Sequence, residues 1–169
     1  FVAGAAEVLS PANDPDHWDV IEGQGAILHP AYSGVTLGLL HGSQPDALVL
    51  CHEATRKEIE LWEDYRIRDL DEVIDTYLGL GSLTNPDIRC VGVSVDTSKL
   101  APTRHEPDLS ELSKSLDLPC VDPLLFAESG PPRQILRSVR IVLRILATHR
   151  SRRLTARRSA AGPAARGGS

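Results

Sequence analysis

The sequence lacks several features that would assign it at once to a class of protein. It contains no methionine and only 3 cysteines, and aromatic residues make up 4% of its 169 residues. No apolar run reaches the roughly 18 residues of a membrane-spanning helix, and no basic and then apolar stretch of the secretory type opens the chain. We therefore expect a cytoplasmic protein. The chain starts at Phe1 and not at a methionine, and its first residues look like the interior of a helix or strand. We therefore expect its natural N-terminus to lie upstream.

Familiar catalytic motifs are also missing. The chain has no Gly-Lys-Ser/Thr phosphate loop, no Gly-x-Gly-x-x-Gly, no Gly-x-Ser-x-Gly and no His-Glu-x-x-His, which excludes the standard form of each site within these residues. Cys51, Cys90 and Cys120 lie in or beside apolar runs and have no zinc-type spacing. We predict that they are buried, reduced thiols and that the chain has no metal site.

The charge divides the chain into two parts. Residues 1–130 hold 8 Lys and Arg against 23 Asp and Glu, a formal charge of −15, whereas residues 131–169 hold 10 Arg and no acid. We expect residues 1–130 to form one α/β domain, and residues 131–169 to be a basic helix at 135–146 with a disordered tail. We expect this tail to be accidental, as a shifted reading frame would produce. No aromatic residue lies among these arginines to stack on bases, so neither nucleic acid nor a membrane is the expected partner.

The apolar pattern predicts alternating strands and helices. The expected strands are residues 18–22, 46–52, 88–95 and 120–121, and the expected helices are 34–43, 69–80 and 108–116. For the first helix, Ser33 is the expected N-cap and Gly42 the expected terminator. The acidic run Glu58, Glu60, Glu63 and Asp64 reads as a solvated face. Such alternation predicts an α/β fold in three layers, a mostly parallel sheet with helices on both faces.

Polar side chains gather after two of the expected strands. Glu22 ends the first and is followed by Gly23-Gln24-Gly25, where a carboxylate can accept a proton and glycines let a ligand approach the backbone. A tight turn with a solvated Glu22 is the alternative. His29 and His41 are equally open to a packing role.

The second strand end is more suggestive. His52 and Glu53 suit proton transfer, and Arg56 suits bidentate binding of a carboxylate. The alternative is a surface salt bridge at the start of a helix.

Residues 18–56, from Trp18-Asp-Val-Ile-Glu-Gly-Gln-Gly to Cys-His-Glu-Ala-Thr-Arg56, resemble the D-glutamate N-acetyltransferase (DgcN-like) family. The similarity extends over about residues 1–126, with weaker matches at 90–98 and 118–123. It implies the later part of a domain of the P-loop NTPase type, similar to dethiobiotin synthetase. The phosphate loop and a Rossmann-like domain are then expected upstream, and the chain alone is expected to be inactive.

The resemblance implies acetyl transfer from acetyl-CoA to the amino group of D-glutamate. It makes Glu22, His52 and Glu53 candidate bases; the candidate binding residues are Gly23, Gly25, His29, Tyr32, Ser33, Thr36 and Arg56. The intact protein is expected to act on a small molecule as a homo-oligomer. Two alternatives stay open. One is an ATP-dependent enzyme of the dethiobiotin synthetase type, for which nucleotide and magnesium are the candidate cofactors, and the other is a non-catalytic module whose basic tail binds nucleic acid.

Overall fold

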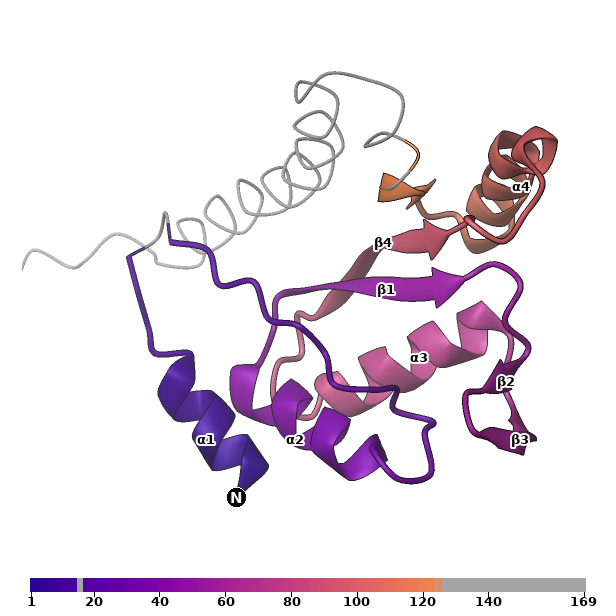
Figure 1. Cartoon of the computed structure of the whole chain (residues 1–169). Helices are drawn as coiled ribbons and strands as arrows, with labels where there is room; N and C mark the ends of the chain where they lie inside the picture. The colour runs from indigo at the N-terminus through magenta and orange to yellow at the C-terminus, as the bar shows by residue number, and fades with distance from the viewer. Residues whose placement is uncertain (15–16, 124, 126–169) are drawn as a thin grey trace, which may run out of the picture. The chain divides into compact units, whose positions relative to one another are not determined.

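The computed structural model describes residues 1–14, 17–123 and 125 (Figure 1). Phe1–Asp122 is the first of the two units into which the chain divides. The fold described below is that of the first unit. The expected basic helix at 135–146 and its tail lie outside the described residues. No helix in the described part of the chain has both the length and the apolar character needed to cross a membrane.

A parallel sheet of three strands forms the centre of this unit. Its strands are β1 (Ala47–Glu53), β4 (Arg89–Asp96) and β5 (Cys120–Val121), in the order β1-β4-β5. The register pairs Leu50 with Val93 and His52 with Val95. All neighbouring strands run parallel, as the continuous apolar runs of the sequence predict.

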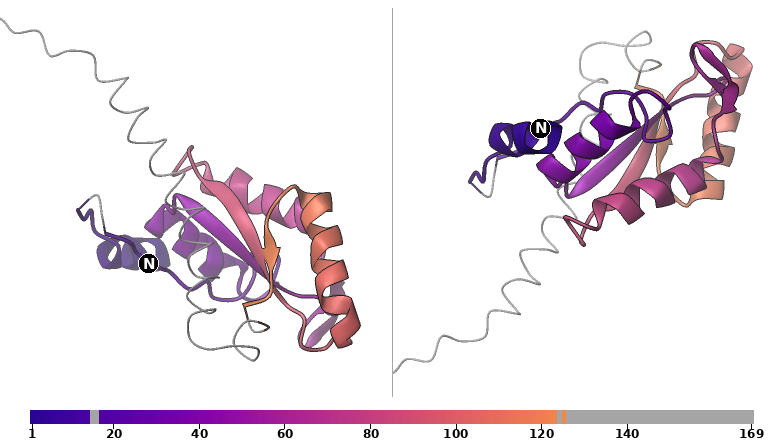
Figure 2. Two further views of the ribbon diagram at one scale, coloured as in Figure 1. Left: turned by 90° about the horizontal axis from the view of Figure 1, so that it is seen from above. Right: turned by 90° about the horizontal axis from the view of Figure 1, so that it is seen from below.

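Helices cover both faces of the sheet, which confirms the predicted α/β class. Helix α3 (Leu70–Gly81) connects β1 to β4, and α4 (His105–Leu116), preceded by the short 3₁₀ turn η1 (Pro102–Arg104), connects β4 to β5. Because both connections step in the same direction across the sheet, right-handed crossovers place α3 and α4 on the same side. Figure 2 shows them there, with α2 (Ser33–Ser43) on the other side.

The core lies between the sheet and its crossover helices. Ile74 of α3 packs with Val93 and Val95 of β4, and all three are buried. The partly buried side chains around them are Leu50, Ala54, Leu78, Cys90, Leu109, Leu112, Leu116, Leu118 and Cys120. Full burial of an aliphatic side chain such as Val93 or Val95 contributes about 1.5–3 kcal/mol, and the partly buried side chains add smaller amounts. These contacts hold both helices on the sheet.

The predicted strand at residues 18–22 is wrong. These residues have no regular secondary structure, and Val20 is 92% exposed. An apolar run becomes a strand only beside a partner that accepts its backbone hydrogen bonds. Among the described residues β1 pairs only with β4, and residues 18–22 do not join its other edge.

The ends of helix α2 also differ from expectation. The helix includes Ser33, with Tyr32 as N-cap and no side-chain capping bond, and it continues past Gly42 to Ser43. Gln44 ends it in the left-handed region at a φ of 46°. Gly42 instead allows close packing, since an added Cβ there would lie 2.1 Å from the Ala3 carbonyl oxygen.

A helix and a two-stranded hairpin are absent from the sequence prediction. Helix α1 (Val2–Leu9) packs on α2, and β2 (Glu58–Ile59) pairs antiparallel with β3 (Trp62–Arg66). The acidic run that was expected to be a plain solvated face therefore lies within a hairpin, whose turn places Leu61 at a φ of 66°.

The cysteine prediction is only partly correct. All three thiols are free of disulfides, but Cys51 is exposed, and Cys90 and Cys120 are half-buried. Burial raises the pKa of both half-buried thiols. Cys51 and Val49 are both exposed and flank the half-buried Leu50, so they lie on the face of β1 opposite to it.

Candidate functional site

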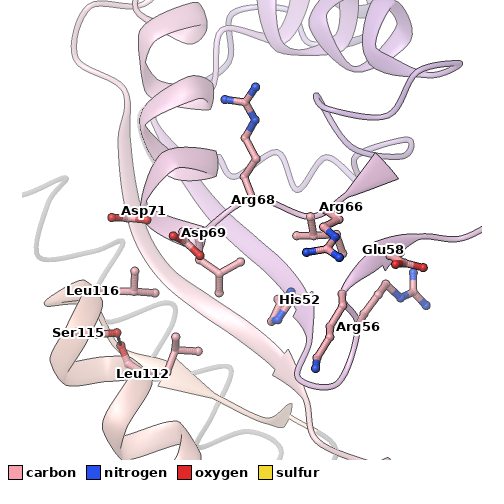
Figure 3. Close-up of a pocket in the computed structure, with 13 residues that line it drawn as sticks. His52, Arg56, Glu58, Arg66, Arg68, Asp69, Asp71, Leu112, Ser115 and Leu116 are labelled. Carbon is pink, nitrogen blue, oxygen red and sulfur yellow. Dashed lines mark hydrogen bonds between the residues drawn. The ribbon is translucent and has the colours of Figure 1, made fainter. Parts of the chain in front are cut away.

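A pocket of about 760 Å³ opens at the carboxyl end of β1. The β2–β3 hairpin, the start of α3 and the end of α4 surround it. Its lining residues are His52, Arg56, Lys57, Glu58, Arg66, Ile67, Arg68, Asp69, Leu70, Asp71, Leu112, Ser115 and Leu116. In Figure 3, His52 lies between the charged side chains of the hairpin and the leucines of α4. Such crevices at the carboxyl ends of parallel strands are the usual ligand sites of α/β sheets.

His52 is the best-placed proton acceptor in this pocket. It is half-buried, and this burial lowers the pKa of its imidazole below the ordinary value of 6.5. Glu53 raises that pKa and Arg56 lowers it, with smaller effects than burial. The imidazole is therefore neutral near pH 7, the form in which one ring nitrogen accepts a proton.

Glu53 is held as an ionised carboxylate. It accepts hydrogen bonds from Lys99 at 2.9 Å, Arg56 at 2.8 Å and Thr55 at 3.0 Å. The bond from Lys99 does most to lower the pKa of Glu53 to about 2. A carboxylate with so low a pKa is a weak base at neutral pH, so the structure favours His52 over Glu53 for proton transfer.

Arg56 lines the pocket, but carboxylates of the protein already engage it. Its Nη2 lies 2.8 Å from Glu53 and 3.6 Å from Glu60. The salt bridge with Glu53 is the alternative that the sequence left open. It fixes the turn after β1, together with the backbone bond from Arg56 N to Glu53 O at 3.0 Å.

The glycine segment after Glu22 forms a second group of expected residues. Gly25 has a φ of 70°, and an added Cβ there would lie 2.9 Å from the Cβ of Tyr32, so glycine is required. The buried Thr36 hydroxyl donates to the Gln24 carbonyl at 2.7 Å, and the Ile27 N–H donates to the Tyr77 hydroxyl at 3.0 Å. These bonds anchor the segment to α2 and α3.

Aromatic contacts join this second group to the hairpin. The His29 ring lies 4.6 Å from the Tyr32 ring and 6.0 Å from the Trp62 ring, and Trp62 meets Tyr65 edge to face at 5.7 Å. His29 Nδ1 also accepts a hydrogen bond from the Ala31 N–H at 3.0 Å. His41 binds the Leu80 carbonyl at 2.9 Å, which is a packing role.

The structure thus separates the expected residues. His52 and Arg56 line the pocket, with Glu53 beside them, whereas Gly25, His29, Tyr32 and Thr36 surround the glycine segment. Ser33 is the first residue of α2, and Glu22 and Gly23 are exposed on the irregular segment.

Several pocket residues were missed from the sequence. Lys57 and Arg66 come from the hairpin region, and Asp69 and Asp71 from the start of α3. The density of basic residues at 56–68, the only such cluster before residue 131, was the signal that could have found them. Within residues 1–14, 17–123 and 125, no group of three or more His, Cys, Asp or Glu is arranged to hold a metal ion.

Comparison with known proteins assigns the family. Residues 1–130 match the model of the "Domain of unknown function (DUF1611_C) P-loop domain". Two curated proteins named D-glutamate N-acetyltransferase are similar to the chain. The one from Tritonibacter scottomollicae is 48% identical over 123 residues, and the one from a Pseudoalteromonas species is 46% identical over 124.

Each of these alignments covers 73% of this chain and 37% of the relative, so the chain spans little more than a third of their length. A crystal structure of a DUF1611 family protein from Anabaena variabilis, at 30% identity, superposes with a TM-score of 0.58. That superposition covers 69% of this chain and 34% of the solved one. The family model covers most of the chain, and both the curated relatives and the solved structure agree with it. The chain therefore belongs to the DUF1611 C-terminal P-loop domain family.

Proposed function

We propose that this chain is part of an enzyme that transfers the acetyl group of acetyl-CoA to the amino group of D-glutamate. The names of the two curated relatives supply the reaction. The observation that carries the proposal here is a neutral, half-buried His52 in a charged pocket at the carboxyl end of β1. This group has the protonation state that the reaction needs.

The chemistry assigns a role to His52. An ammonium cannot attack, so the substrate must first lose a proton to a base, and the neutral imidazole accepts it. The amine nitrogen then attacks the thioester carbonyl, the new N–C bond forms and the C–S bond breaks. As the amide forms, the nitrogen loses a second proton, which the leaving sulfur takes up so that coenzyme A departs as a thiol. The proton held by His52 then passes to solvent. Glu53, fixed by Lys99 and Arg56, holds the turn that positions His52.

The remaining expected residues keep proposed roles. Backbone N–H groups near Gly23 and Gly25, with Tyr32, Ser33 and Thr36, are candidates for stabilising the oxyanion or binding the coenzyme, and Glu22 is a second candidate base. His29 is proposed to support this segment through its ring contact with Tyr32. We also propose a cytoplasmic location, which suits three free thiols, and a homo-oligomeric intact protein.

A nucleotide-dependent reaction is the second candidate, because the matching family model is described as a P-loop domain. An enzyme of the dethiobiotin synthetase type would hydrolyse a nucleoside triphosphate during turnover. Acetyl transfer from acetyl-CoA does not require this hydrolysis. The nucleic-acid alternative depends on residues 131–169, which lie outside the described residues.

The deciding experiment measures coenzyme A release from acetyl-CoA with D-glutamate, using the protein as its gene encodes it. We expect His52→Gln to lower kcat by about 10²–10⁴-fold, the usual contribution of a general base, with folding intact. His105→Gln is the matched control, since His105 binds the Leu100 carbonyl and does not line the pocket.

Three results would change the assignment. Loss of turnover in Glu22→Gln, with full activity in His52→Gln, would move the base to Glu22. A folded wild-type protein that releases no coenzyme A would refute acetyl transfer. Nucleotide hydrolysis in that same protein would favour the second candidate.

A further inference from the structure

We infer that the pocket at the carboxyl end of β1 binds the acceptor amino acid, and that Lys57 and Arg66 hold its carboxylates. Only the identity of the acceptor, D-glutamate, rests on the proposed function. The assignment to a free amino dicarboxylate, rather than to the coenzyme, comes from the charges and contacts of the pocket itself.

The four cationic side chains of the pocket are not equivalent. Arg56 is paired with Glu53 at 2.8 Å, and Arg68 lies 3.8 Å from Glu72. Lys57 and Arg66 have no carboxylate within 4.0 Å among the side chains that the structure describes. Both are exposed at the pocket, so they are the cations available to a ligand.

The hairpin region carries both cations to the pocket. Arg66 lies opposite Glu58 in the β2–β3 pair, and the Ile67 N–H donates to the Lys57 carbonyl at 2.9 Å, so Lys57 lies one position along from Glu58. The two side chains therefore start from opposite faces of the hairpin, and both line the pocket. Two long cationic side chains that reach one pocket from different directions can each engage one carboxylate of a small molecule, with Arg66 able to bind in the bidentate manner.

The pocket offers charges of both signs, as an amino dicarboxylate requires. Lys57 and Arg66 are the cations available to carboxylates, and Asp69 and Asp71 at the start of α3 are the anions available to an ammonium. D-glutamate near pH 7 carries two carboxylates and one ammonium, a net charge of −1. Asp69 and Asp71 attract an ammonium but repel the several phosphate charges of coenzyme A, so the coenzyme is the poorer fit.

The rest of the lining suits the same ligand. Leu112 and Leu116 of α4 offer apolar surface to methylene groups, opposite the charged hairpin side chains in Figure 3, and Ile67 also lines the pocket. His52 lies between these two walls, where it can accept a proton from the bound ammonium. A volume of about 760 Å³ leaves space for the reacting end of an acyl donor beside the amino acid.

Calorimetric titration at low salt, using the protein as its gene encodes it, tests the inference. The probes are D-glutamate, glutarate, which lacks the ammonium, and coenzyme A. We expect D-glutamate to bind more tightly than glutarate, and Arg66→Gln and Lys57→Gln each to weaken D-glutamate binding about tenfold or more. Arg104→Gln is the control, because it removes a cation that pairs with Asp108 outside the pocket. Circular dichroism checks that every variant is folded.

The outcomes separate this inference from the proposed function. D-glutamate binding that depends on Arg66, in a protein that releases no coenzyme A, would support the pocket and refute the acetyl transfer. Acetyl transfer with an unchanged KM for D-glutamate in Arg66→Gln would overturn the pocket assignment and leave the reaction intact. No D-glutamate binding by the folded chain, or a loss confined to coenzyme A, would also overturn it.

Discussion

At the scale of single residues, the best-defined polar contact is buried between two strand ends. Thr97 donates to Asp122 Oδ2 twice, from its backbone N–H at 2.9 Å and from its hydroxyl at 2.5 Å. Both residues are 1% exposed. Thr97 follows β4 and Asp122 follows β5, so one carboxylate oxygen ties together the carboxyl ends of neighbouring strands.

This contact gives a prediction about stability. Asp122→Ala leaves a buried N–H and a buried hydroxyl without their acceptor, and we expect the free energy of unfolding to fall by about 1–3 kcal/mol for each group. Asp122→Asn keeps an acceptor oxygen and is expected to lose less. Urea denaturation provides the measurement. Asp108→Asn, which breaks only the exposed pair with Arg104, is the control and should cost less than about 1 kcal/mol. An equal loss in Asp108→Asn and Asp122→Ala would contradict the prediction.

At the scale of elements, the packing of α1 on α2 depends on Gly42. An added Cβ at this position would lie 2.1 Å from the Ala3 carbonyl oxygen and 2.8 Å from the Ala6 Cβ. Backbone cannot move away as a flexible side chain can, so Gly42→Ala must displace α1. We expect faster hydrogen exchange in the amides of Val2–Leu9, with little change in β4.

Gly34 offers the matched control in the same helix. A Cβ added there meets nothing within 4 Å, so Gly34→Ala should raise stability by up to about 1 kcal/mol through helix propensity alone. If Gly42→Ala also stabilised the protein and left α1 protected from exchange, the packing described here would be wrong.

The sequence predicted those elements whose pattern is local. The strands at 46–52 and 88–95 and the helix at 69–80 each occur one residue later than expected, and 120–121 is unchanged. For these strands and this helix, the apolar run or the helical period of the sequence is sufficient evidence, because each element packs its apolar side chains against a neighbouring element. Residues 18–22 have an equally apolar run but no pairing partner among the described residues, so pattern alone misassigned them.

At the scale of the whole molecule, the candidate site was only partly readable from the sequence. His52, Glu53 and Arg56 follow a recognisable strand and were predicted together. Lys57 and Arg66 join them because a hairpin folds beside the end of β1, and the short β2, with only two residues, has no apolar alternation to reveal it. The sequence pattern was therefore enough to find His52, the candidate proton acceptor. Lys57 and Arg66 join the pocket only through the tertiary structure.

The pH dependence of stability is a property of the whole molecule with identifiable sources. Burial lowers the pKa of His52 below 6.5, and hydrogen bonds lower the pKa of Glu53 to about 2 and that of Asp96 below its usual 3.8. In each case the unfolded chain binds protons at a higher pH than the folded chain does. Acidification therefore favours unfolding through all three groups.

We expect the free energy of unfolding to fall in two stages as the pH is lowered. The first begins near pH 6.5, where the unfolded imidazole of His52 takes up a proton that the folded one resists, and the second begins near pH 4.5 and extends toward pH 2 through Glu53. Urea midpoints measured from pH 8 to pH 3 test this. His52→Gln should flatten the first stage only, and Glu53→Gln should reduce the second. A first stage that persists unchanged in His52→Gln would show that the imidazole is not buried in its neutral form, and it would remove the physical basis for assigning His52 as the base.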